Sequence, residues 1–364
     1  MNILFVHTIG KKKYGGGERW VVNAAGGMHD HGHDVILAGS KNSVLLEEAR
    51  HRGVKTLNFS VYSDFNFFKA WRLSRIIRDN NIDVLICKGR ELAVSGLAAR
   101  WSGRNPVLIR RSGSPPPTRS LRLVLRTQWF VHGVITNTQT IQEIYHQNGF
   151  TEENFVKIIY NGLTLHDELP PYNFADKFPG KLVVLCIGRV VAHKGYFFLI
   201  DAIPEILKKF PSLLFYVLGD GRDKERLEKY AREKGVADKI VFAGYIHQPI
   251  PYIKGCDFFL HPSLYEGMPN APMEAMAYGK PVIMTRVNGA EELSNNGEYA
   301  LLIPPSDSDA IANAVVHLME NRENQYNVAA KAQSFVRDKF GMKTMIRNLE
   351  TYILDRKQKM DKAK

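Results

Sequence analysis

Short apolar runs alternate with longer amphipathic stretches along most of the chain. Runs such as residues 3–7, 84–87 and 182–187 predict buried strands, and the amphipathic stretches of roughly 10–15 residues between them predict helices. This alternation indicates parallel sheets with helices on both faces. In the first half, the predicted strands are 3–7, 35–38, 55–59, 84–87, 107–109, 134–137 and 156–160, and the predicted helices are 19–31, 69–80, 92–101 and 140–148.

The alternation stops at a proline- and glycine-containing segment and then starts again. A chain of 364 residues also exceeds the ~250–300 residues that one core usually holds. We therefore predict an α/β fold of two Rossmann-like parallel-sheet domains, 1–165 and 182–341, joined by a linker at 166–181. The domains are expected to face each other across a cleft that holds the active site, because ligands of such sheets bind beyond the carboxyl ends of the strands. In the second half, the predicted strands are 182–187, 214–218, 258–261 and 301–303. The predicted helices are 195–210, a helix that begins at 272, a helix that ends near 321, 326–338 and 342–354. The charged tail at 356–364 is expected to fray.

The cysteines and the hydropathy pattern favour a cytoplasmic protein. Cys87, Cys186 and Cys256 are scattered, lie in or beside apolar runs and lack the spacing of a metal site, so buried reduced thiols are expected. No apolar run reaches the ~18–20 residues of a membrane-spanning helix. The apolar segment at the N-terminus is too short for a secretory signal.

Positive charge is concentrated in the first half of the chain. Residues 1–165 contain 22 basic and 12 acidic residues, a net charge of +10 out of the total of +12. Such asymmetry indicates an anionic partner, whether nucleic acid, acidic lipid or charged saccharide. Nucleic acid is disfavoured because no aromatic platform or binding motif accompanies the arginines.

The most informative stretch follows the predicted strand 258–261. Its loop contains Glu266 and Gly267, and we place the start of the next helix at Pro272, with Glu274 in the first helical turn. Main-chain N–H groups of residues 267–271 would form an anion site there. Prolines prevent the two glutamates from sharing one helical face, so they are expected to approach a ligand from different directions. Taken singly, each has an ordinary explanation, as a solvated loop residue or a helix-start carboxylate.

Two further loops have candidate chemistry. Arg189 and Lys194 stand five residues apart on a turn between a strand and a helix, where a planar fork and a point charge can hold one diphosphate. A solvated pair is the ordinary alternative. Gly15, Gly16 and Gly17 follow the first strand and would let the backbone approach a ligand at a helix start. A glycine run alone equally suits a flexible turn.

Together these residues resemble the signature of the retaining GT-B glycosyltransferases of family 4. From Glu266 the chain reads Glu-Gly-Met-Pro-Asn-Ala-Pro-Met-Glu-Ala-Met-Ala-Tyr-Gly-Lys-Pro-Val-Ile, which fills every position of the family sequence EGxPxxxxEAMAxGxPVI. Arg189 and Lys194 match the family's GR-x4-KG motif, residues 15–18 its GGxE loop, and residues 244–246 its GF/YV turn. The resemblance covers nearly the whole chain and is strongest from 182 to 305.

The resemblance implies a role for each matched residue. Arg189 and Lys194 would neutralise the leaving diphosphate and Glu266 would hold the donor sugar, and these are the predicted catalytic residues. Glu274 would bind the ribose, and the backbone at Ile246 would meet the base, so no side chain identifies that base. The remaining predicted nucleotide-sugar-binding residues are Gly15, Gly16, Gly17, Gly219, Gly267, Met268, Pro269 and Asn270.

The resemblance also implies the overall reaction and the course of the chain. Retention of anomeric configuration would follow from front-face substitution, and a last helix, at about 342–358, would pack on the N-terminal, acceptor-binding domain. No metal or other cofactor is expected, because cations and N–H groups of the protein can stabilise the diphosphate. Asp307-Ser308-Asp309 mimics a metal-binding DxD motif, but Ser306 or Asp307 is expected to cap a helix instead.

The acceptor side departs from the family pattern. Family members often carry histidines after the strands at 84–87 and 107–109, whereas this chain has Lys88, Arg110 and Arg111 there. We predict that these three cations bind an anionic acceptor, with a structural role as the alternative.

A basic helical face is predicted further along the chain. Arg119, Arg122 and Arg126 are expected to share it, with Leu123, Trp129 and Phe130 nearby. Such a face suits either an anionic membrane surface or plain solvent.

We therefore predict a metal-independent, retaining hexosyltransferase. It would move a sugar from a nucleotide-diphosphate donor, with UDP or GDP as the nucleotide, to an anionic or lipid-linked saccharide such as a lipopolysaccharide core. It would act in the cytoplasm or peripherally on the inner face of the cell membrane, without a nucleic-acid partner. Two alternatives stay open: a nucleotide-sugar epimerase or hydrolase of the same fold, and a non-catalytic subunit that anchors a glycosyltransferase complex to the membrane.

Overall fold

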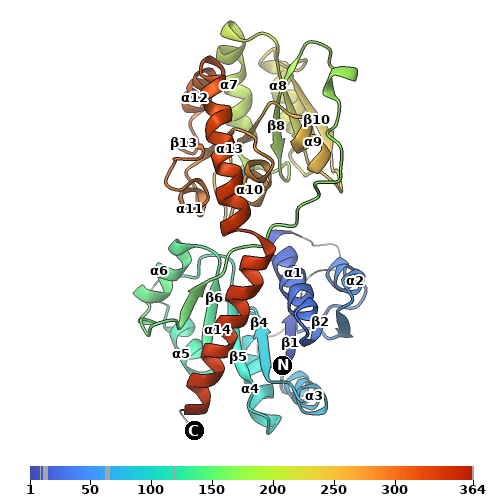
Figure 1. The fold of residues 1–364 in the computed structure, drawn as a ribbon, viewed down its shortest axis with the longest axis vertical. Coiled ribbons are helices and arrows are strands. Elements are labelled where there is room, and N and C mark those ends of the chain that lie inside the picture. Colours follow the sequence, from blue (N-terminus) through green and yellow to red (C-terminus); the bar gives the residue numbers. More distant parts are fainter. Residues whose placement is uncertain (9, 11–14, 62–65, 119, 363–364) are drawn as a thin grey trace. The chain divides into compact units, whose positions relative to one another are not determined.

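The computed structural model describes residues 1–8, 10, 15–61, 66–118 and 120–362. The chain divides into two compact units (Figure 1). Unit 1 is formed by Met1–Gly162 together with Phe340–Lys364, and unit 2 by Leu163–Lys339. The predicted domains, 1–165 and 182–341, fall within these units apart from a few residues at their edges.

Unit 1 is built on a parallel sheet of seven strands in the order β3-β2-β1-β4-β5-β6-β7. Its central strands are buried on both faces, which explains why the sequence shows continuous apolar runs there rather than alternation. The elements are β1 (Asn2–His7), α1 (Gly16–Asp30), β2 (Asp34–Gly39), α2 (Val44–His51), β3 (Lys55–Asn58), α3 (Phe67–Asp79), β4 (Val84–Cys87), α4 (Leu92–Trp101), β5 (Val107–Ser112), α5 (Leu121–Phe130), β6 (Gly133–Thr136), α6 (Gln139–Gln147), β7 (Val156–Ile158) and α14 (Met342–Lys362).

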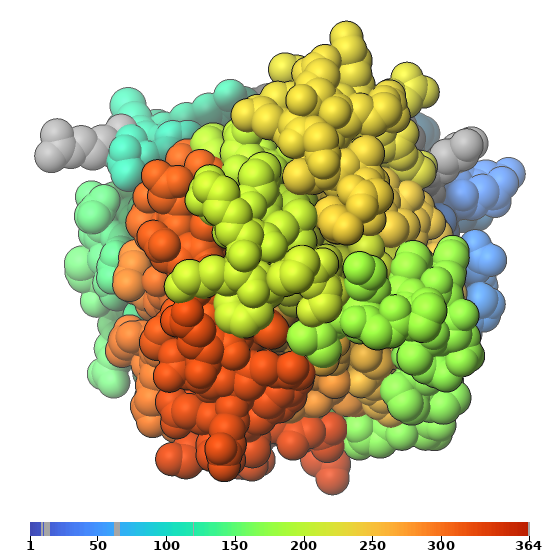
Figure 2. Space-filling view, turned by 90° about the horizontal axis from the view of Figure 1, so that it is seen from above, coloured from blue at the N-terminus to red at the C-terminus, as the bar shows by residue number. Residues whose placement is uncertain are grey.

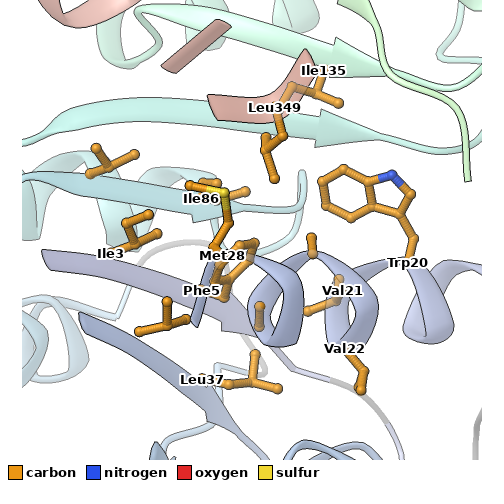
Figure 3. Close-up of a cluster of buried hydrophobic side chains, with 14 of the residues drawn as sticks. Ile3, Phe5, Trp20, Val21, Val22, Met28, Leu37, Ile86, Ile135 and Leu349 are labelled. Carbon is orange, nitrogen blue, oxygen red and sulfur yellow. The ribbon is translucent and has the colours of Figure 1, made fainter. Parts of the chain in front are cut away.

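Helices cover both faces of this sheet. On one face, α1, α2 and α14 pack around a core that includes Trp20 and Leu349, and Figure 3 shows these side chains converging over the strands. On the other face, α3, α4, α5 and α6 bury Leu73, Leu123 and Ile141. Unit 1 is therefore a doubly wound sheet, as predicted.

The last helix is longer than predicted. Residues 356–362 continue α14 instead of fraying, because the buried Arg356 donates a 2.8 Å bond to Glu152 and Lys359 lies 3.2 Å from the same carboxylate. Tyr352 donates a 2.7 Å bond to the carbonyl of Phe155. The helix packs on unit 1, although all of unit 2 separates it in the sequence from the rest of unit 1.

Unit 2 is built on a parallel sheet of six strands in the order β10-β9-β8-β11-β12-β13. Figure 2 looks onto one end of this unit, where the lime to yellow segments around α7 and α8 lie beside the orange-red segments around α12 and α13. The elements are η1 (Phe174–Asp176), β8 (Leu182–Ile187), η2 (Ala192–Lys194), α7 (Tyr196–Lys209), β9 (Leu213–Leu218), α8 (Lys224–Glu233), β10 (Ile240–Gly244), α9 (Ile250–Gly255), β11 (Phe258–His261), α10 (Asn270–Ala277), β12 (Val282–Thr285), α11 (Ala290–Ser294), β13 (Leu301–Ile303), α12 (Ser308–Glu320) and α13 (Arg322–Lys339).

The predicted linker, residues 166–181, packs against unit 2. Lys254 donates to the carbonyls of His166, Asp167 and Leu169, and the ring of Tyr172 stacks on Tyr252 with centroids 4.3 Å apart.

Two local predictions are confirmed. Asp307 caps α12 by accepting a 2.8 Å bond from the N–H of Ala310. Cys87, Cys186 and Cys256 are buried free thiols.

Candidate active site

The turn that holds Arg189 and Lys194 leaves the carboxyl end of β8 and packs against the loop that follows β9. A Cβ atom on Gly219 would lie 1.9 Å from the carbonyl oxygen of Gly188, and one on Gly221 would lie 2.2 Å from that of Val190. The N–H of Val190 donates a 3.0 Å bond to the carbonyl of Asp220. Only glycines permit this approach, so residues 219–221 fix the first half of the turn.

The second half of the turn packs against the loop that follows β11. Gly195 has a φ of +74°, and a Cβ atom there would lie 1.8 Å from the carbonyl oxygen of Pro262. The N–H of Leu264 donates a 2.8 Å bond to the carbonyl of His193. The two predicted cations therefore stand on a turn that is held from both sides.

The carboxylate of Glu266 lies at the centre of this loop cluster. Its Oε1 atom pairs with Lys194, lies 3.0 Å from Nε2 of His261 and accepts a 2.9 Å bond from the hydroxyl of Ser263. Burial opposes ionisation of Glu266, but the hydrogen bond from His261 and the charge of Lys194 outweigh it, and the pKa falls to about 2. Glu266 is therefore an ionised, nearly buried carboxylate with a fixed orientation at neutral pH.

Positive charge dominates the outer side of the turn. Burial lowers the pKa of His193, and so do the charges of Lys194, Arg189 and Arg222 around it. Arg189 is exposed, and no ion pair to its guanidinium occurs within the described part of the chain. Lys194 is mostly buried in its pair with Glu266. The exposed guanidinium of Arg189 thus lies at the end of β8 without a paired carboxylate among the described residues, which suits an anionic ligand.

Helix α10 begins two residues before the predicted start. Its first residue is Asn270, so Pro272 occupies the third helical position and Glu274 lies beyond the first turn, contrary to our prediction. Pro272 is tolerated because the first bond along the helix is donated by Met273, to the carbonyl of Pro269 at 3.3 Å, so no earlier N–H is needed. Glu274 is half-buried.

The loop before α10 is packed against the loop after β12. Gly289 has a φ of +78°, and a Cβ atom there would lie 2.7 Å from the sulfur of Met268 and 3.2 Å from the carbonyl oxygen of Gly267. The loop after β10 joins the β9 loop, because the N–H of Gly219 donates a 2.8 Å bond to the carbonyl of Gly244. Ile246, two residues after Gly244, is half-buried. The predicted donor-site residues of unit 2 therefore lie on contiguous loops at the carboxyl edge of one sheet, apart from Asn270 and Glu274, which belong to α10.

A second charged cluster lies at the carboxyl edge of the sheet in unit 1. Glu18 accepts a 3.0 Å bond from the N–H of Gly15, and its Oε1 lies 3.1 Å from His7 and 3.3 Å from Lys88. Burial opposes ionisation of Glu18, yet the bond from His7 and the charge of Lys88 lower the pKa to about 2. Burial lowers the pKa of His7 to about 4, so this ring is neutral at pH 7.

The predicted glycine loop forms the start of α1 beside this cluster. Gly15 is the N-cap residue of α1, and Gly16 is its first residue. A Cβ atom on Gly17 would lie 3.3 Å from the Lys88 ammonium and 3.6 Å from the guanidinium of Arg111. The sequence motifs gave no role to His7, which ends β1 and lies 3.5 Å from the Lys88 ammonium.

The structure separates the three cations predicted to bind an acceptor. Arg111 is buried against the ring of Trp20, 4.5 Å from its centroid, on the same side as Lys88. Arg110 points to the opposite face of the sheet, where it lies 5.7 Å from the ring of Tyr145 and bonds Thr127 at 3.4 Å. Side chains alternate along a strand, so Arg110 and Arg111 leave β5 on opposite faces. A Cβ atom on Gly89, next to Lys88, would nevertheless lie 3.2 Å from the Arg110 guanidinium. Binding of an anionic acceptor by these three cations stays a prediction.

Sequence comparison identifies both units. Residues 181–321 match the family described as Glycosyl transferases group 1, and residues 14–167 match Glycosyltransferase Family 4. The two matches together span well over half of the chain. The chain belongs to the family 4 glycosyltransferases.

Relatives of this glycosyltransferase include two lipopolysaccharide core biosynthesis glycosyltransferases of Rhizobium meliloti. LpsD is 25% identical over 346 residues, which cover 91% of this chain and 92% of LpsD. LpsE is 30% identical over 149 residues, which cover 41% of this chain and 43% of LpsE.

A solved structure shows the same fold. Anabaena HepE in complex with UDP and glucose matches with a TM-score of 0.82 and 22% identity over 98% of this glycosyltransferase and 100% of HepE. The two parallel-sheet units are those of the GT-B fold.

Two features are absent from the described residues of this glycosyltransferase. These residues contain no group of three or more His, Cys, Asp or Glu side chains placed to hold a metal ion. Among them, no helix combines the length and the apolar character that crossing a membrane requires.

Proposed function

We propose that this glycosyltransferase moves a hexose from a UDP-sugar to a saccharide acceptor, with retention of anomeric configuration and without a metal ion. The observation that carries the proposal is the cluster in which Lys194, His261 and Ser263 hold the carboxylate of Glu266 beside the exposed Arg189. Cations and a fixed carboxylate at one sheet edge are the groups that breaking a sugar–phosphate bond requires.

Arg189 and Lys194 would stabilise the departing diphosphate. As the bond from the anomeric carbon to the phosphate oxygen breaks, negative charge grows on that oxygen, and nearby cations lower the energy of this state. Lys194 already pairs with Glu266, so an arriving diphosphate would share an ammonium that is already oriented. Glu266 would accept hydrogen bonds from hydroxyls of the donor sugar, and Glu274 from the ribose. Because Arg189 and Lys194 would stabilise the charge of the diphosphate, the reaction would need no divalent ion.

The acceptor is proposed from the relatives and from charge. LpsD and LpsE are lipopolysaccharide core glycosyltransferases, and the edge of unit 1 presents Lys88 and Arg111 near the start of α1. An anionic or lipid-linked saccharide fits these cations. Work on such an acceptor would take place at the cytoplasmic face of a membrane.

The donor is best identified by thermal shift against a panel of nucleotide sugars. A bound ligand raises stability by RT ln(1 + [L]/Kd), so the true donor and its free nucleotide should both raise the Tm. We expect the largest shifts with UDP-sugars. A rise in Tm with GDP-sugars and none with UDP-sugars would contradict the UDP assignment.

The mechanism is tested with Lys194→Ala. We expect transfer to be abolished while the far-UV circular dichroism spectrum stays that of the wild type. Lys208→Ala is the matched control, because Lys208 stands exposed in the last turn of α7, at the end away from the site. Transfer at wild-type rate in Lys194→Ala would overturn the mechanism. Consumption of donor at full rate without any acceptor would instead indicate a hydrolase or an epimerase.

A further inference from the structure

Exposed large apolar side chains gather on three helices of unit 1. Of the eleven such side chains among the described residues, seven belong to α3, α4 and α5, and each is between 45% and 72% exposed. Three of the other four are tyrosines, whose hydroxyl makes exposure ordinary. The seven, which we call the α3–α5 surface, are Phe67, Phe68, Trp71, Trp101, Leu121, Leu125 and Trp129.

Side-chain contacts join the three helices laterally. Phe67 on α3 stacks on Trp101 on α4, with ring centroids 6.2 Å apart. Arg100 on α4 reaches α5, where it donates to the carbonyl of Trp129 and lies 5.2 Å from the ring of Phe130. The α3–α5 surface is therefore continuous rather than a set of isolated side chains. Figure 1 shows α3 and α4 lying next to each other in unit 1.

The same helices are strongly basic. They contain Asp79 as their one acidic residue, against seven basic residues: Lys69, Arg72, Arg75, Arg78, Arg100, Arg122 and Arg126. Arg75 lies 5.2 Å from the ring of Trp71, so a cation and an aromatic ring are presented together. Of the basic face predicted from the sequence, Arg122 and Arg126 lie on α5, Leu123 is buried in the core, and Arg119 lies outside the described residues.

We propose that the α3–α5 surface binds an anionic lipid bilayer. Tryptophan, phenylalanine and leucine side chains can enter the headgroup and upper acyl region, while arginines and lysines bind the anionic phosphates. A second copy of the chain is a poor occupant, because a two-fold contact would set seven cations against the same seven. Nucleic acid would leave the leucines of α5 without partners.

The inference deepens the proposed function, since it names the surface by which a transferase acting on a lipid-linked acceptor would reach it. It does not depend on sugar transfer for its test. Binding to vesicles is measured without donor or acceptor, so the two proposals can fail separately.

The tryptophans supply a direct measurement. Trp71, Trp101 and Trp129 belong to the α3–α5 surface, and the fourth tryptophan, Trp20, is buried in the core. With vesicles of phosphatidylcholine containing roughly a third phosphatidylglycerol, we expect the emission to shift to the blue, quenching by acrylamide to fall, and the protein to sediment with the vesicles. Pure phosphatidylcholine should bind far less, and added salt should weaken binding.

Two variants and a control separate the contributions. Arg72→Glu/Arg75→Glu should weaken binding at least 25-fold, because each cation near an anionic surface contributes about fivefold. Trp71→Ser/Trp129→Ser should weaken it at least tenfold, through the lost burial of apolar area. Arg50→Glu/Arg347→Glu changes the net charge equally, but on α2 and α14, which cover the other face of the sheet. This control should bind as the wild type does.

Several outcomes would overturn the proposal. Wild-type protein that stays in the supernatant with anionic vesicles is one, and equal loss of binding in the control variant is another. A concentration-dependent dimer that disappears in Trp71→Ser/Trp129→Ser would assign the surface to a second copy instead. All variants should keep the Tm shift that a nucleotide sugar gives the wild type, which shows that unit 2 is intact.

Discussion

Replacing Glu266 by glutamine tests the electrostatics of the candidate site directly. The change keeps the size and one acceptor oxygen of the side chain but removes the charge that Lys194 and His261 face. The pKa of Glu266 falls from its ordinary 4.5 to about 2, and at ~1.36 kcal/mol per pKa unit this difference corresponds to at most ~3.4 kcal/mol of folding free energy. A charge-assisted bond contributes at least ~1.5 kcal/mol, so we expect Glu266→Gln to lose ~1.5–3 kcal/mol at pH 7.

The loss should depend on pH in one direction. A carboxyl with a depressed pKa in the folded state contributes stability that is complete above its unfolded pKa and fades as the pH falls through the folded one. The difference between wild type and Glu266→Gln should therefore be constant from about pH 5 upwards and shrink as the pH falls from 4.5 towards 2.

The assay is urea unfolding followed by two probes. All four tryptophans, at positions 20, 71, 101 and 129, lie in unit 1, so their fluorescence reports that unit, while far-UV ellipticity reports both. We expect Glu266→Gln to move the ellipticity transition. Glu233→Gln, an exposed carboxylate on α8, should change stability by less than about 0.5 kcal/mol. An equal loss at pH 3.5 and pH 7 would refute the reasoning, because the charge would then not be the source of the stabilisation.

Three further predictions follow from the packing and from the proposed chemistry. Gly195→Ala should destabilise unit 2, because its Cβ would lie 1.8 Å from the carbonyl oxygen of Pro262. Donor binding, measured by calorimetry, should weaken at least tenfold, and wild-type affinity would show that the turn can shift freely. Gly27→Ala should lower the free energy of unfolding by about 1–3 kcal/mol, since its Cβ would lie 2.4 Å from two atoms of Ile346 on α14. The double variant Gly27→Ala/Ile346→Ala should lose less than the sum of the two single variants, and strict additivity in urea unfolding would contradict this contact. Transfer should continue at an unchanged rate in excess EDTA, and loss of activity restored by Mg²⁺ would show that a metal is needed after all.

Much of the fold could be predicted because buried parallel strands have continuous apolar sequences. Strand β11 and helix α4 begin and end at the predicted residues. Helices α2, α8, α9 and α11 were missed, and three of these are eight residues or shorter, which leaves too few turns for a helical period to stand out. The end of α14 was mispredicted because its stability comes from Glu152, about two hundred positions away in the sequence.

Candidate site residues could be predicted where a short sequence motif contains them, and were missed where none does. Glu266 and Lys194 were found from motif spacing, and the fold brings them into contact across 72 residues. His261 and Ser263 received no role, although both flank Pro262 just ahead of Glu266, and a polar residue ending an apolar strand is the signal that could have found them. The opposite directions of Arg110 and Arg111 could have been predicted, since side chains alternate with a period of two along a strand.

The return of α14 to unit 1 has a consequence for synthesis on the ribosome. Residues 1–162 emerge first, yet the core around Trp20 stays uncovered until residues 342–362 have been translated, after the whole of unit 2. The nascent amino-terminal half must therefore wait, with apolar surface open to chaperones, for a helix that is encoded some two hundred codons later. Truncation just before Met342 should accordingly yield aggregates even though every strand of both sheets is present.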